Sequence, residues 1–108
     1  MKILKFLLIY FFVSITINVN TVADEAKMKK GLEIFNETAG CAACHVLKAA
    51  GSVGNIGPNL DTVSMTIESV TDMVTNGLGV MPAFGEGEIL TKEEIETVSY
   101  FVVNSVNN

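Results

Sequence analysis

The chain has 108 residues, of which 49% are hydrophobic, and its length allows one small domain rather than several. Its formal net charge is −5 at pH 7; residues 24–108 hold all twelve acidic residues but only five lysines and no arginine, which gives this part a net charge of −7. This excess of negative charge argues against a nucleic acid or an anionic lipid surface as partner.

Residues 1–23 have the layout of a secretory signal peptide. Two lysines precede an apolar run over residues 6–17, and a small-residue site ends at Ala23. The alternative is a retained membrane helix, which needs about 20 predominantly apolar residues, and polar residues interrupt this run before that length. We predict cleavage after Ala23, export from the cytoplasm, a mature domain of residues 24–108 and no stable membrane insertion after cleavage.

A helix is predicted from Asp24 to about Thr38–Gly40. Asp24 and Glu25 suit a helix start, and apolar residues follow at helical spacing: Ala26, Met28, Leu32, Ile34 and Phe35. Gly31 lies inside this helix, where glycine costs about 1 kcal/mol relative to alanine. The glycine is either a surface position or a point where another helix comes close.

Both cysteines and the only histidine of the chain fall in one segment, Cys41-Ala42-Ala43-Cys44-His45. This order is the attachment motif of a c-type haem. Two thiols one helical turn apart can each add to a different vinyl group of one porphyrin, and the histidine that follows faces the iron as a strong ligand. The motif therefore predicts one covalently bound haem c.

Three other interpretations of the same residues are weaker. A thioredoxin-like redox pair calls for a βαβ context, and no strand pattern surrounds the cysteines. A structural zinc site takes four ligands, and two cysteines with one histidine reach three at most. A disulfide between Cys41 and Cys44 would close a very small loop and stabilise little.

The second half of the chain alternates loops and helices. An irregular, glycine-bearing loop is predicted from Val46 to about Val63, long enough to wrap a large group such as haem. A short helix follows over residues 67–76, capped by Ser64 or Thr66 and stopped by Asn76-Gly77. After a second irregular segment, residues 78–87, Thr91 and Glu94 form a capping box that starts the last helix.

With the haem motif near the mature start, Gly57-Pro58-Asn59-Leu60 in the middle, Met81-Pro82 in a glycine-bearing loop and a capped terminal helix, the chain resembles the class I cytochromes c over residues 26–106. The resemblance implies an all-α fold of about four short helices around one haem. It also implies that the N- and C-terminal helices cross.

The resemblance assigns a role to each site residue. Cys41 and Cys44 would form the thioether bonds, and His45 and Met81 would be the axial iron ligands. The backbone carbonyl of Pro58 would accept a hydrogen bond from His45 Nδ1. Among the other methionines, Met65, at the end of a loop, is the alternative distal ligand.

At the helix crossing, the resemblance implies that Gly31 and Phe35 meet Val98 and Phe101. Tyr100 competes with Phe101 for this place, because the family usually has a tyrosine there. On helical periodicity, Met73 is expected to pack in the core.

The resemblance implies a periplasmic one-electron carrier rather than an enzyme, expected as a monomer. The donor would be a quinol-oxidising complex or a periplasmic dehydrogenase, and the acceptor a terminal oxidase or a reaction centre. Electrons would leave through a haem edge with an apolar rim, formed by residues such as Ala42, Ala43, Val80, Ala83 and Phe84. The alternatives are a haem enzyme or gas sensor with a labile distal ligand, a Cys-x-x-Cys thiol-disulfide oxidoreductase, and a carrier tethered by an uncleaved leader.

Overall fold

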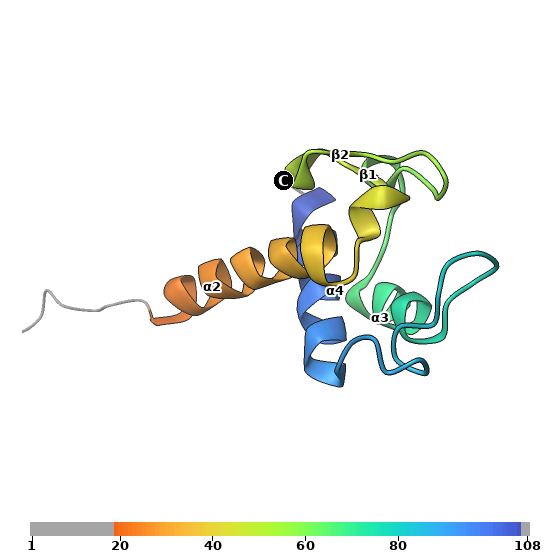
Figure 1. Ribbon diagram of the computed structural model, residues 1–108. Coiled ribbons are helices and arrows are strands. Elements are labelled where there is room, and N and C mark those ends of the chain that lie inside the picture. Colours follow the sequence, from red (N-terminus) through yellow and green to blue (C-terminus); the bar gives the residue numbers. More distant parts are fainter. Residues whose placement is uncertain (1–18, 107–108) are drawn as a thin grey trace, which may run out of the picture.

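The computed structural model describes residues 19–106. This part holds three α-helices, α2 (Val19–Glu33), α3 (Ile67–Asn76) and α4 (Lys92–Val106), and a short antiparallel hairpin of β1 (Val46–Leu47) and β2 (Ser52–Val53) (Figure 1). Single 3₁₀ turns lie at Cys41–Ala43, Lys48–Ala50 and Leu60–Thr62. The architecture is the predominantly helical class I fold that the resemblance implies. The predicted signal peptide falls mostly on residues 1–18, outside the described residues.

Helix α2 begins at Val19, five residues before the predicted start, and ends in one π turn over Ile34–Thr38. The Ala39 N–H donates to the Ile34 carbonyl at 2.9 Å, which closes this turn. Gly40 then adopts a left-handed backbone with φ of 69°, which glycine does without a Cβ penalty. The chain thereby turns directly from α2 into the segment that carries the cysteines.

The first and last helices cross at Gly31, as predicted (Figure 1). A Cβ added at Gly31 would overlap the Cβ of Phe101 and lie 3.0 Å from the Thr97 carbonyl oxygen. The rings of Phe35 and Phe101 pack edge to face, with centroids 6.0 Å apart. Phe101 is therefore the crossing residue. Tyr100 lies half-buried beside it, with Lys27 Nζ 4.6 Å from its ring centroid.

Side-chain caps start the other two helices where the sequence predicts them. Thr66 accepts from the Ser69 N–H at 3.2 Å, and Ser69 Oγ accepts from the Thr66 N–H at 3.1 Å. At α4, Thr91 and Glu94 form the same reciprocal pair at 2.8 and 3.2 Å. Thr66, rather than Ser64, is thus the cap of α3.

The core lies among the three helices and beneath the hairpin. Its buried apolar residues are Ile34, Phe35, Leu47, Val70, Val74, Phe84, Leu90, Ile95, Val98, Phe101, Val102 and Val103. Two expectations were wrong. The loop after His45 contains a hairpin, with Leu47 N bonded to the buried Ser52 Oγ at 2.9 Å. Met73 is 39% exposed, because Val70 and Val74 occupy the buried face of α3.

Replacing Gly31 by alanine should destabilise the protein by about 1–2 kcal/mol. Alanine has a helix propensity about 1 kcal/mol more favourable than glycine. Overlap with Phe101 costs about 1–3 kcal/mol, and we expect the upper end of this range because the Thr97 main-chain carbonyl is also close. Chemical denaturation of the haem-loaded protein measures the difference. Ala26→Gly, on the exposed part of the same helix, isolates the propensity effect. A stabilised Gly31→Ala variant would contradict the close crossing.

Candidate haem site

The two cysteines lie on one tight turn that follows α2. Cys44 N and His45 N both donate to the Cys41 carbonyl, at 3.1 and 3.0 Å. In a 3₁₀ turn the side chains of residues i and i+3 eclipse, so Cys41 and Cys44 point to the same side. Both are free thiols and partly exposed. The turn therefore presents two sulfurs to one edge of a flat ligand.

The imidazole of His45 is held by the backbone of the following loop. His45 Nδ1 lies 2.8 Å from the carbonyl oxygen of Pro58, which is the contact expected from the resemblance. A carbonyl can only accept, so Nδ1 carries the proton and Nε2 keeps its lone pair. This is the tautomer that a histidine needs to ligate a metal through Nε2.

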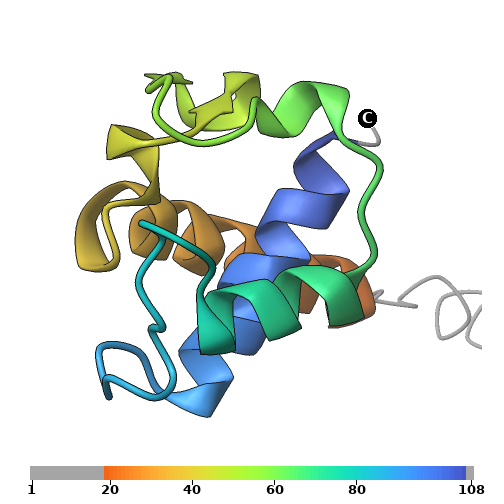
Figure 2. The same cartoon turned by 90° about the vertical axis from the view of Figure 1, so that its right-hand side faces the viewer.

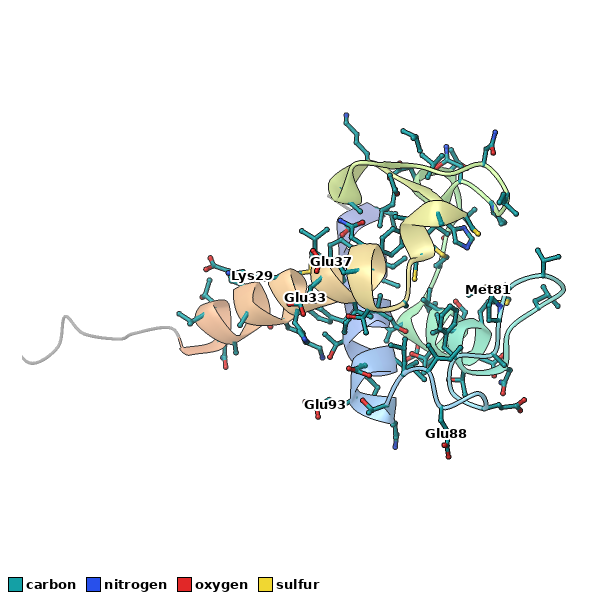
Figure 3. The ribbon with its side chains drawn as sticks, in the orientation of Figure 1. Lys29, Glu33, Glu37, Met81, Glu88 and Glu93 are labelled. Carbon is teal, nitrogen blue, oxygen red and sulfur yellow. The ribbon has the colours of Figure 1, made fainter. Side chains whose placement is uncertain are left out.

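Met81 lies on the loop that follows α3 (Figure 3). Leu78 and Met81 exchange two backbone hydrogen bonds, of 3.2 and 3.0 Å, and Phe84 N donates to the Val74 carbonyl at 3.0 Å. Gly77 permits the turn out of α3 because its φ is 68°. The Met81 side chain, partly buried against the core, is thus carried by a loop that is bonded back to α3.

Burial alone does not distinguish Met81 from the other methionines, because Met28 and Met65 are also partly buried against the core. The position of each methionine in the secondary structure does distinguish them. Met28 lies within α2, and Met65 directly precedes the Thr66 cap of α3. Met81 lies in a hydrogen-bonded turn of a loop without regular secondary structure, where a side chain can be aimed at a ligand.

Exposed apolar side chains lie at the end of β2 and on the two loops beside this site. Val53, Ile56, Leu78 and Val80 are 86%, 68%, 70% and 87% exposed. The loops that carry them extend from the same side of the molecule, which faces the viewer in Figure 2. So much exposed apolar surface on a small chain is typical of a face that meets a ligand or a partner. It fits a large apolar group such as haem.

The prediction of an apolar rim around the haem edge was only partly right. Val80 is exposed as expected, but Phe84 is 7% exposed and belongs to the core. Sequence reasoning missed Val53, Ile56 and Leu78. Their signal was nevertheless present, because each is an apolar residue in a glycine-bearing segment for which the sequence predicts no helix or strand.

The environment of the cysteines argues against thiol-disulfide chemistry. Burial raises the pKa of the Cys41 thiol from 9.0 to about 11, whereas catalytic cysteines have lowered values that favour the thiolate. The residues after His45 form an antiparallel hairpin instead of a βαβ unit. Within residues 19–106, no three His, Cys, Asp or Glu side chains gather as a metal cluster.

Comparison with known proteins places these features in a family. The family model described as cytochrome c oxidase, cbb3-type, subunit III matches residues 26–102. Cytochrome c6 of Gracilaria tenuistipitata var. liui is 34% identical over 108 residues, which cover 94% of this chain and 96% of the relative. Cytochrome c6 of Porphyra purpurea is 37% identical over 91 residues, which cover 77% and 76% of the two chains.

A solved structure agrees with this chain in both sequence and fold. The c-type cytochrome SorU from Sinorhizobium meliloti is 48% identical, with a TM-score of 0.69. The match covers 76% of this chain and 93% of that chain. At this level of identity, the likeness extends beyond the fold to the family.

Replacing both Cys41 and Cys44 by alanine should abolish covalent haem attachment. Each single variant should keep at most one thioether bond, because the two sulfurs serve different vinyl groups. Haem staining of a denaturing gel measures the covalent product, and Ala42→Ser and Ala43→Ser, on the same turn, serve as controls. Full staining of the double variant would exclude the attachment assigned to this motif.

Proposed function

The chain belongs to the class I c-type cytochromes, and we propose that it is a periplasmic one-electron carrier whose haem iron is ligated by His45 and Met81. The haem c and the electron-carrying role follow from the family. In the proposal, Cys41 and Cys44 form the two thioether bonds, and Pro58 fixes the orientation of His45. The observation that carries the proposal is the 2.8 Å contact between His45 Nδ1 and the Pro58 carbonyl oxygen. His45 directly follows the paired cysteines, so the contact orients the imidazole next to both thiols.

When bound, the haem supplies an iron that takes up and releases one electron. His45 and Met81 would both ligate the iron, and would thereby leave no ligand position open to a substrate. The Pro58 carbonyl holds the proton at His45 Nδ1, which increases the basicity of Nε2. The thioether of Met81 is a soft, neutral donor that favours the ferrous state and raises the potential relative to a second imidazole.

The apolar loops provide a surface for electron exchange with partner proteins. Residues 49–60 and 73–85 contain no charged side chain. Figure 3 labels charged residues elsewhere, along α2, in the π turn that follows it and at the lower end of the view: Lys29, Glu33, Glu37, Glu88 and Glu93. Transient redox complexes bury less than about 1,200 Å², which a small apolar rim can provide.

The proposed donors and acceptors are those of a periplasmic shuttle. A quinol-oxidising complex or a periplasmic dehydrogenase would reduce the carrier, and a terminal oxidase or a reaction centre would oxidise it. The carrier is proposed as a monomer, since one exposed face must serve donor and acceptor in turn. Among residues 19–106, no helix has the length and apolarity needed to cross a bilayer.

Replacing Met81 by alanine should open the iron to carbon monoxide and lower the reduction potential. The loss of a soft ligand removes a preference for ferrous iron and frees one coordination position. Optical spectra of the reduced protein with and without carbon monoxide measure the first effect, and a redox titration measures the second. Met65→Ala and Met73→Ala serve as matched controls. If the Met65→Ala variant bound carbon monoxide and the Met81→Ala variant did not, the distal ligand would be assigned to Met65.

The mature protein should begin at Asp24 if residues 1–23 are a signal peptide. Cleavage there would leave Asp24 and Glu25 in the first turn of a shortened α2, where acidic side chains interact favourably with the helix dipole and stabilise the helix. Intact-mass measurement of the protein from a host that exports it and attaches haem provides the test. A mass that includes residues 1–23 would favour the membrane-tethered carrier.

A further inference from the structure

We propose that Gly57 is a positioning residue whose missing side chain sets the orientation of the His45 imidazole. This inference rests on the proposed function, in which His45 ligates the haem iron. It concerns a glycine that the haem motif does not include. Its evidence is the contact between the two residues in this chain.

The α-carbon of Gly57 packs against the imidazole itself. A Cβ built on Gly57 would lie 2.5 Å from His45 Cε1, 2.9 Å from Nδ1 and 3.0 Å from Nε2. Distances below 3.0 Å cannot be kept, so either the ring or the loop would have to move. The backbone of Gly57 is not left-handed, since the positive φ values belong to other glycines. The constraint on this position is therefore the contact alone.

The loop cannot retreat freely from the ring, because it is attached on both sides of Gly57. The Gly57 N–H donates to the Cys44 carbonyl at 2.8 Å, and the carbonyl of Pro58 accepts from His45 Nδ1 at 2.8 Å. Gly54 also lies close to the cysteine turn: a Cβ there would be 2.6 Å from the Ala43 carbonyl oxygen. A side chain at residue 57 is thus accommodated mainly by rotation of the imidazole.

Rotation of the ring would change the electron donation from His45 to the iron. It would move Nδ1 away from the Pro58 carbonyl and weaken their hydrogen bond. That bond increases the electron density the imidazole donates to a metal, which favours the ferric state. An added side chain at residue 57 should therefore shift the equilibrium toward ferrous haem and change the orientation of the ligand plane.

Gly57→Ala, in the haem-loaded protein, tests the inference against a control from the preceding hairpin turn. Gly51 has a φ of 67° and no atom within 4 Å of an added Cβ, so Gly51→Ala adds backbone strain without touching the ring. We expect Gly57→Ala to shift the ferrous-to-ferric ratio about threefold to tenfold toward ferrous, where tenfold is about 59 mV for one electron. The ferric electron paramagnetic resonance spectrum should shift as well. Gly51→Ala should be less stable but keep the wild-type potential and spectrum.

An unchanged potential and spectrum in Gly57→Ala would overturn the inference. So would equal shifts in Gly51→Ala, since a general strain of the backbone after His45 would then explain both variants. Neither result would affect the assignment of His45 as a ligand.

A measurement on the wild-type protein keeps the test independent of whether Gly57→Ala takes up haem. In the ferrous, diamagnetic protein, nuclear Overhauser spectra should show a strong cross-peak between the His45 Hε1 proton and a Gly57 α-proton. Its absence would overturn the inference. In the ferric protein, the His45 ring protons should show iron-induced shifts; their absence would overturn the proposed function itself.

Discussion

The contact between Gly31 and Phe101 is the constraint on which the rest of the structure depends. Because Gly31 has no side chain, α2 and α4 come close enough for Phe35 to pack edge to face on Phe101. The same two helices position both sides of the candidate site. The end of α2 leads directly into the cysteine turn, and α4 packs on α3, whose last turn anchors the loop of Met81. One helix crossing thus relates two segments that are about 40 residues apart in the sequence.

The two sides of the site are held by different means. On the His45 side, the backbone of the 54–58 loop contacts the cysteine turn and the imidazole directly. On the Met81 side, backbone hydrogen bonds fasten the loop to itself and to α3. Both arrangements fix the backbone that carries the proposed ligands. Such preorganisation suits an electron carrier, because fixed groups need little rearrangement when the charge of the iron changes.

Local chemistry made much of this structure predictable from the sequence. The capping residues Thr66 and Thr91, the turn of the haem motif and the crossing at Gly31 all follow from short patterns or from the family resemblance. The failures depend on tertiary contacts. Phe84 is buried because its backbone is tied to Val74, and the hairpin after His45 depends on a buried serine hydroxyl, which no local pattern indicates. The approach of Gly57 to His45 is visible only in three dimensions.

The optical spectrum of the haem-loaded protein, taken oxidised, reduced, and reduced under carbon monoxide, tests the account most directly. A carrier with His45 and Met81 on the iron should show a c-type spectrum, with the far-red band of methionine-ligated ferric haem and no response to carbon monoxide. A colourless protein would contradict the haem assignment and would favour thiol-disulfide chemistry at Cys41 and Cys44. A spectrum that changes under carbon monoxide would show an open or labile distal position and contradict the electron-carrier account.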